Sequence, residues 1–292
     1  MKNWGSWILA ARPKTLTAAL LPILVASALA QIFAGGFLWW VSLLTLLASL
    51  FIQVGTNLVN DAVDFKKGAD TEKRLGPTRV TQAGIFEAKQ VMAAGFFCFF
   101  LALLCGIPLV IRGGWPICIV GLISILMGYA YTAGPFPLAY RGLGDLFVIL
   151  FFGLIAVGGA YYLQTGHWDL KAGIAGLQVG FHCTVLIAIN NLRDMTGDRL
   201  VQKKTLPVRF GAGFARWEIA FLCFAPFFLG LYWSSQGSLW AFLLPCLISP
   251  LAFRITKLVF ETEPSPVYNR FLGQAAGLHL IFGVLLSVGF FL

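Results

Sequence analysis

Long uncharged stretches of apolar residues alternate along the chain with short segments rich in Lys and Arg. A membrane-spanning helix needs roughly 20 apolar residues to cross about 30 Å of hydrocarbon at a rise of 1.5 Å per residue. The stretches that reach this length predict nine spans. They are residues 15–60, divided near Gly35 and Gly36 into two spans, then 90–111, 113–140, 146–168 and 172–192, the run 219–253, divided at WSSQGS with its second part continuing toward Phe260, and 271–292.

Composition agrees with this pattern, because 59% of the 292 residues are hydrophobic and only 11% are charged. A soluble domain has a much higher share of charged residues. The predicted fold class is therefore an all-α polytopic membrane protein, with residues 1–292 forming a single transmembrane domain.

The basic residues predict an orientation when successive loops are assigned alternately to the two sides of the membrane. Only Arg112 and Lys171 fall on the side opposite the N-terminus, so 19 of the 21 Lys and Arg share the N-terminal side. The positive-inside tendency places that side in the cytoplasm. We expect a multi-pass protein of the cell (inner) membrane, whose net charge of +9 reflects topology and not nucleic-acid binding.

A first polar cluster interrupts the apolar pattern in NLVNDAVDFKKGAD, residues 57–70, at the cytoplasmic end of the second span. If that helix continues for two more turns, four of its polar side chains fall at i, i+3, i+4 and i+7, which is one helical face. These are Asn57, Asn60, Asp61 and Asp64. Gly68 is expected to end the helix, which leaves Asp70 on a basic loop.

A second polar cluster occurs in NNLRDMTGDRLVQKKTLPVRFG, residues 190–211, at the cytoplasmic end of the sixth span. The spacings of three and four residues again bring amides and carboxylates to one face. The members are Asn190, Asn191, Asp194 and Asp198. Each cluster leads into a loop rich in Lys and Arg, which suggests an internal duplication.

Clustered carboxylates repel one another, and a charged side chain costs up to about 2.5 to 3.5 kcal/mol deep in a bilayer. A single cluster also fits an ordinary helix end in the headgroup region, but two similar clusters favour a shared cation. Oxygen ligands of this kind suit Mg²⁺, which takes one or two carboxylates, keeps water and completes its shell with phosphate oxygens. The neighbouring Lys and Arg would meet the remaining phosphate charge.

This arrangement predicts a diphosphate held at the cytoplasmic surface with a hydrophobic tail between the spans, which describes a polyprenyl diphosphate. Mg²⁺ would stabilise the leaving group, and an electron-rich acceptor would attack the allylic cation that remains. A cation-coupled transporter is the alternative class. Its substrate site would be expected near mid-bilayer, whereas these carboxylates sit at span ends on one side.

The two clusters resemble the signature of the UbiA-type intramembrane aromatic prenyltransferases, and the resemblance covers essentially the whole chain. Within the family it is strongest to the branch that prenylates 1,4-dihydroxy-2-naphthoate. The motifs that carry it are ARPKTL at 11–16, the two clusters, GPTRVTQAG at 76–84 and YRGLGDL at 140–146. The resemblance implies nine helices around a central cavity and transfer of a polyprenyl group with loss of the carboxylate, giving demethylmenaquinone. Another acceptor, 4-hydroxybenzoate or homogentisate, stays open.

The resemblance also implies roles for individual residues. Asp61, Asp64, Asp194 and Asp198 would be the catalytic Mg²⁺ ligands, and Asn57, Asn60, Asn190 and Asn191 their amide partners. Lys204, Arg209 and Arg79 would meet the diphosphate. Position 68 is Gly where many members of the family have a third carboxylate, so Asp70 is either a ligand or a residue that orders the basic loop.

Five further residues have two interpretations each. Arg12 and Lys14 could bind an anion or anchor the first span at the interface. Tyr131 and Tyr129 are two apart on a helix, so at most one of them should line the cavity. Asp145, beside Arg141, fits either a loop ion pair or a position near the acceptor.

Overall fold

The computed structural model describes residues 4–69 and 75–292, and in these ranges it contains helices and no strands. The predicted all-α fold class is therefore confirmed. The helices are α1 (Trp4–Ala11), η1 (Pro13–Thr15), α2 (Thr17–Phe33), α3 (Trp39–Lys66), α4 (Ala88–Ala130), η2 (Leu138–Arg141), α5 (Gly144–Val148), the π-helix η3 (Ile149–Ile155), α6 (Ala156–Thr165), α7 (Leu170–Leu200), α8 (Leu206–Ser235), α9 (Leu239–Cys246), α10 (Ser249–Glu261) and α11 (Tyr268–Phe291).

Six helical segments of the described chain are long and apolar enough to cross a membrane. They are α3, α4, the continuous α5–η3–α6, α7, α8 and α11. Two bent pairs, Trp4–Thr15 with α2 and α9 with α10, raise the number to eight if each pair is one span. The multi-pass character is thus confirmed, while the number nine and the cytoplasmic N-terminus stay predictions.

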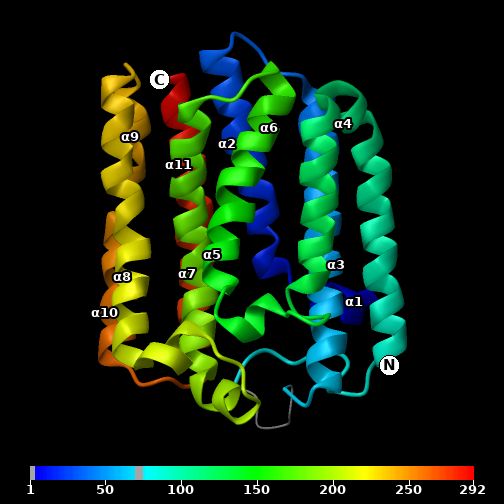
Figure 1. The fold of residues 1–292 in the computed structure, drawn as a ribbon. Helices are drawn as coiled ribbons and strands as arrows, with labels where there is room; N and C mark the ends of the chain where they lie inside the picture. The colour runs from blue at the N-terminus through cyan, green and yellow to red at the C-terminus, as the bar shows by residue number, and fades with distance from the viewer. Residues whose placement is uncertain (1–3, 70–74) are drawn as a thin grey trace.

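Helix α4 is a hairpin of two arms, because Gly114 has φ 66° and ψ −154° inside its 43 residues. Figure 1 shows the two arms side by side, joined at the end of the bundle opposite α1. The predicted break at residue 112 therefore lies close to the observed one. The fourth span, however, was wrongly extended to residue 140. The helix ends at Ala130, since Gly134 has φ 76° and the two prolines of GPFP cannot donate helical hydrogen bonds.

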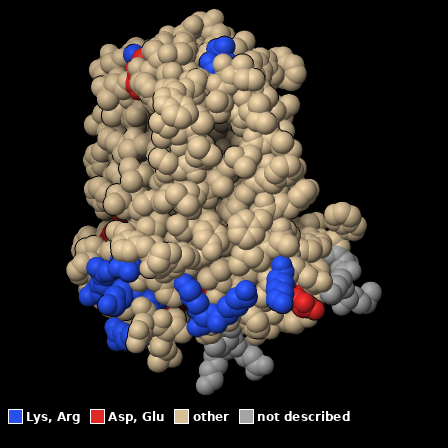
Figure 2. Space-filling view, turned by 45° about the vertical axis from the view of Figure 1, so that its right-hand side comes forward, with Lys and Arg blue, Asp and Glu red and all other residues tan. Residues whose placement is uncertain are grey.

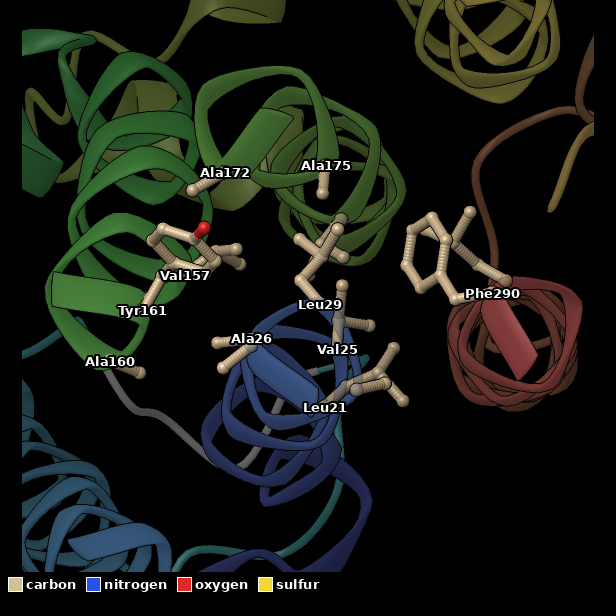
Figure 3. Packing of buried hydrophobic residues seen from close by; sticks show 14 of the residues in the cluster. Leu21, Val25, Ala26, Leu29, Val157, Ala160, Tyr161, Ala172, Ala175 and Phe290 are labelled. Atoms are coloured by element: carbon tan, nitrogen blue, oxygen red, sulfur yellow. The ribbon is translucent and has the colours of Figure 1, made fainter. Parts of the chain in front are cut away.

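The core forms around α2, which packs against α3, α6, α7 and α11. Figure 3 shows Leu21, Val25, Ala26 and Leu29 of α2 pointing toward side chains of α6, α7 and α11. Helix α7 is the most enclosed candidate span, with 72% of its apolar window buried against at most 44% in the others. The second polar cluster is therefore the end of a helix that its neighbours hold on many sides.

Three glycines bring η3 into backbone contact with α7. A Cβ on Gly153 would lie 2.5 Å from the carbonyl oxygen of Gly176 and 2.8 Å from the Cα of Gly180. Small residues four apart allow such close approach of helices within membranes. The contact lies on the segment where the helix widens to a π-helix, and it fixes the α5–η3 segment against α7.

Basic side chains gather at the end of the bundle that holds α1, η2 and the start of α8, and only a few lie at the opposite end (Figures 1 and 2). Between the two ends, the surface in Figure 2 is almost free of charged atoms, as expected for a belt that faces lipid. The ends of α3 and α7, which carry the polar clusters, lie at the basic end.

Candidate active site

Two cavities meet inside the bundle. One, of about 790 Å³, is lined by polar residues from the ends of α3 and α7 and from α5. The other, of about 520 Å³, is lined mainly by apolar residues of α2, α3, α4, η3 and α6. Tyr131 lines both, and Tyr129 lines neither, as their spacing predicted. Burial raises the pKa of Tyr131, so its hydroxyl keeps its proton at the junction.

The end of α3 carries the first cluster to the polar cavity. Gly68 has φ 70°, and the backbone N–H groups of Gly68 and Ala69 donate to the carbonyls of Phe65 and Asp64 at 3.1 and 2.9 Å. This is a Schellman C-cap, so Gly68 ends the helix as predicted. One turn before it, Asn60 and Asp64 line the cavity together.

The other two members of the first cluster face away from the cavity lining. The Asp61 carboxylate accepts hydrogen bonds from the backbone N–H groups of Val80 and Thr81 at 3.3 and 3.2 Å and is 1% exposed. Asn57 donates to the carbonyl of Ala11 at 2.9 Å. In the structure, Asp61 therefore holds the loop at Val80 and Thr81, and Asn57 holds the end of α1. Their assignment to the metal site stays a prediction.

The end of α7 presents all four members of the second cluster to the same cavity: Asn190, Asn191, Asp194 and Asp198. Three carboxylates predicted from two separate motifs, Asp64, Asp194 and Asp198, thus share one cavity. The sequence prediction that the two clusters face each other agrees with this lining.

Arg193, which the sequence analysis did not single out, organises the second cluster. Its guanidinium is fully buried and donates to both carboxylate oxygens of Asp194 at 2.8 and 2.7 Å and to the amide oxygen of Asn190. It also donates to the side-chain oxygen of Asn269 at 2.7 Å, and Asn269 donates to the carbonyl of Leu75 at 2.9 Å. Arg193 therefore connects α7, α11 and the loop that follows α3.

The lysine that lines the polar cavity is Lys203, and not the predicted Lys204. Lys203 lines the cavity with its ammonium 3.4 Å from Asp198. Burial opposes its charge, but the carboxylates of Asp198, Asp64 and Asp194 outweigh burial and raise the pKa of Lys203. Lys204 is absent from the lining, and its backbone N–H donates to the carbonyl of Tyr140 at 3.0 Å.

Arg209 is likewise absent from the cavity lining. Its guanidinium donates to the carbonyls of Arg141 and Lys204 at 2.7 and 3.1 Å. A Cβ on Gly142 would lie 2.5 Å from the Lys204 carbonyl oxygen, so the backbone of η2 packs closely on the start of α8. Arg209 therefore holds this junction together.

Tyr140 is a second residue that sequence reasoning missed. Its hydroxyl donates to Asp64 at 2.8 Å, and the Lys67 ammonium lies 4.3 Å from the centre of its ring. Burial lowers the pKa of Lys67, although Asp64 counteracts it. No periodic signal marks Tyr140, because it lies in η2, a 3-10 helix of four residues that is too short to show a repeat.

Some of the remaining predicted residues line the polar cavity, and others do not. Arg12 and Arg79 line the polar cavity. Lys14 is exposed and does not line it, which favours the anchoring interpretation. Asp70 lies outside the described residues. Asp145 is buried in the first turn of α5, lines the cavity and accepts a hydrogen bond from Asn191 at 3.3 Å, so the structure gives it the cavity position and not the ion pair with Arg141.

The lining fits Mg²⁺ by the chemistry of its donors. Oxygens of Asn60 and Asp198 are buried without a hydrogen-bond partner, and carboxylates of α3 and α7 surround the same space. Within the described ranges, no three His, Cys, Asp or Glu side chains are close enough to hold a metal by themselves. An ion bound here would use one or two carboxylates and complete its shell with water and phosphate oxygens, which is the usual coordination of Mg²⁺ in proteins.

Comparison with known proteins agrees with this geometry. Residues 19–281 match the model of the UbiA prenyltransferase family. The chain therefore belongs to this family of prenyltransferases.

Among curated relatives, the 1,4-dihydroxy-2-naphthoate octaprenyltransferase of Escherichia coli is 35% identical over 300 residues, covering 97% of this chain and 96% of the relative. The Haemophilus influenzae protein of the same name is 34% identical over 297 residues, with 97% and 94% covered.

Solved structures share the fold at low identity. An apo UbiA homologue from Aeropyrum pernix aligns with a TM-score of 0.72 at 14% identity, covering 93% of this chain and 97% of that one. A UbiA homologue from Archaeoglobus fulgidus bound to DMAPP and Mg²⁺ aligns with a TM-score of 0.59 at 18% identity, covering 97% and 99%.

Proposed function

We propose that the protein transfers a polyprenyl group from a polyprenyl diphosphate to 1,4-dihydroxy-2-naphthoate with loss of the carboxylate, forming the quinol form of demethylmenaquinone for menaquinone synthesis. The observation that carries the proposal is the joined pair of cavities. Carboxylates and a lysine line the polar one, and it meets an apolar one of about 520 Å³ at Tyr131. A polyprenyl diphosphate likewise has a charged head, which suits the polar cavity, and a long apolar tail, which suits the other.

The diphosphate would bind among Lys203, Arg79 and Arg12, which all line the polar cavity. One or two of the carboxylates of Asp64, Asp194 and Asp198 would hold each Mg²⁺, with water and phosphate oxygens completing its shell, and Mg²⁺ when bound supplies Lewis-acid stabilisation of the departing diphosphate. Tyr140 orients Asp64, and Arg193 orients Asp194 through two hydrogen bonds. These contacts keep the carboxylates in place before the substrate arrives, which reduces the reorganisation needed at the reacting centre.

The tail and the allylic carbon would occupy the apolar cavity. Phe147, Phe151 and Phe152 line it on the α5–η3 side, and the rings of Phe147 and Phe151 stack with centroids 5.5 Å apart. Aromatic faces stabilise a nearby cation, and an apolar lining keeps water from it. The acceptor is thereby favoured over water as the nucleophile.

The relatives named above as 1,4-dihydroxy-2-naphthoate octaprenyltransferases support this acceptor. The test is an assay of the purified protein in lipid with Mg²⁺, a polyprenyl diphosphate and either 1,4-dihydroxy-2-naphthoate or 4-hydroxybenzoate. We expect prenylated naphthoquinol, diphosphate and CO2 with the first acceptor. Product with 4-hydroxybenzoate alone would overturn the assignment of the acceptor, and product with neither would overturn the reaction class.

A further inference from the structure

Asp145 is a buried carboxylate at the cavity for which the proposed diphosphate and metal chemistry has no use. It is 4% exposed and lines the polar cavity. Its Oδ2 accepts one hydrogen bond from Asn191, while its Oδ1 is buried with no hydrogen-bond partner. Burying a carboxylate oxygen without a hydrogen-bond partner costs free energy. A functional role for Asp145 would explain why such an oxygen lies beside the cavity.

The other three cavity carboxylates each have a strong donor. Asp64 accepts from the Tyr140 hydroxyl, Asp194 from the Arg193 guanidinium, and Asp198 lies 3.4 Å from the Lys203 ammonium. Asp145 forms no ion pair within the described part of the chain. Its hydrogen-bond donors are the neutral amide of Asn191 and its own backbone N–H, and the Lys203 ammonium is near enough to act on its charge without pairing with it. The Oδ1 atom of Asp145 is therefore free to accept a proton.

The position of Asp145 is the border between the two cavities. A Cβ on the preceding residue, Gly144, would lie 3.0 Å from the Tyr131 hydroxyl, and Tyr131 lines both cavities. The glycine thus lets Tyr131 approach the first turn of α5. In the proposed arrangement, the diphosphate ends and the allylic carbon begins at this border, so an acceptor ring that attacks the carbon lies beside Asp145.

We propose that Asp145 is the catalytic base that takes the hydroxyl proton of the aromatic acceptor. This inference rests on the proposed prenyl transfer. The proton moves from the ring hydroxyl to Oδ1 of Asp145, and the electron pair left on oxygen increases the electron density of the ring. A ring carbon forms the new C–C bond as the allylic C–O bond breaks, and the electrons of that bond leave on the diphosphate.

Loss of the carboxylate completes the balance. The attacked carbon releases CO2, and the pair of electrons from that bond restores the aromatic ring with a negative oxygen. This oxygen takes the proton back from Asp145, which ends the turnover unchanged. General-base assistance of this kind contributes about 10²- to 10⁴-fold to a rate.

The experiment compares Asp145→Asn with Asp169→Asn in lipid, with Mg²⁺ and a polyprenyl diphosphate. Asp169 is the control, because it caps the opposite end of α7, where it accepts from the Lys171 N–H at 2.8 Å, and lines neither cavity. We expect Asp145→Asn to lower kcat/KM for the acceptor about 100-fold or more. Release of diphosphate without acceptor should stay within about threefold of wild type, because ionisation of the allylic bond does not use this base. Asp169→Asn should match wild type in both assays.

Acceptor acidity separates a base from a residue that only shapes the site. Ring-fluorinated acceptors, whose hydroxyl group loses its proton more readily, should reduce the ratio of the wild-type rate to the Asp145→Asn rate, and Asp145→Glu should restore part of the lost rate with the parent acceptor. An equal loss for every acceptor, an equal loss of acceptor-independent diphosphate release, or an unchanged rate would each overturn the proposal. If wild type prenylates only 4-hydroxybenzoate, the naphthoate assignment fails, and the same Asp145 comparison is made with that acceptor and its fluorinated forms.

Discussion

The ends of α3 and α7 carry similar runs of Asn and Asp, yet they use them differently. Helix α7 presents all four predicted side chains to the cavity, while α3 presents Asn60 and Asp64. Asp61 instead accepts two backbone hydrogen bonds from the loop at Val80 and Thr81. A repeated motif therefore predicts which residue types gather at a site, but the neighbours of each helix decide which of them reach it.

The largest effect should come from removing a cavity carboxylate from either helix. We expect Asp64→Asn and Asp198→Asn each to lower kcat about 10³-fold, because support of the leaving group is worth several kcal/mol at 1.36 kcal/mol per tenfold. Single-turnover prenyl transfer in lipid measures this. Asp169→Asn is the control, since Asp169 caps the opposite end of α7, where it accepts from the Lys171 N–H at 2.8 Å. Near-normal turnover in either cavity variant would contradict the proposal that both α3 and α7 provide metal ligands.

The next effect concerns the residue that distinguishes α7 from α3. Arg193→Met removes a buried guanidinium and leaves Asp194 uncompensated, which should lower the free energy of unfolding by about 3 to 5 kcal/mol. Thermal unfolding in detergent measures the loss. Lys257→Met, which breaks an exposed pair with Glu261, should cost at most about 1 kcal/mol. Equal unfolding temperatures for the two variants would contradict the central position of Arg193.

Asp61→Asn tests the loop assignment within the first cluster. The amide can accept from one backbone N–H but not from both, so local opening of the loop should become easier by about 1 to 3 kcal/mol. Hydrogen exchange at Val80 and Thr81 should speed up roughly ten- to a hundredfold, whereas Asp64→Asn should leave it unchanged. Unchanged exchange together with a weakened Mn²⁺ affinity would favour the predicted metal role of Asp61.

The smallest effect belongs to Tyr140. Tyr140→Phe removes the 2.8 Å hydrogen bond to Asp64 while keeping the ring beside the Lys67 ammonium, so we expect turnover to fall about tenfold. Tyr129→Phe is the matched control, because Tyr129 packs against Phe96 and lines neither cavity. A larger loss in the Tyr129 variant would show that turnover reports packing and not the orientation of Asp64.

The lengths of the uncharged apolar runs were sufficient to predict the fold class and the breaks near Gly35 and Gly114, and the glycine itself predicted the helix stop at Gly68. Spans are set by length and hydrophobicity, which a single sequence displays directly. The extension of the fourth span to residue 140 failed because uncharged residues can also form an irregular segment when Pro and Gly interrupt them.

The site was predictable only as a set of residue types. Helical spacing predicted that Asp194 and Asp198 share a face, and the need for a shared cation predicted that the cluster with Asp64 faces them, as the cavity lining has it. Neither argument could separate Lys203 from Lys204, since both follow the end of α7 in an irregular turn. Arg193 was overlooked because a positive charge among carboxylates resembles an ordinary surface pair. Its position three residues after Asn190 and next to Asp194 was the available signal, and only the packing of α11 shows that the guanidinium is buried.

The hydrogen bond from Asn269 to the Leu75 carbonyl spans 194 positions of the sequence. A chain is made from its N-terminus, so the loop after α3 leaves the ribosome long before the residue that holds it. The last helix must insert before Arg193 and Leu75 acquire their common partner. The end that holds the proposed active site is thus among the final parts of the molecule to be completed. A nascent chain halted before α11 would have every predicted carboxylate but not Asn269, which joins Arg193 to the loop at Leu75.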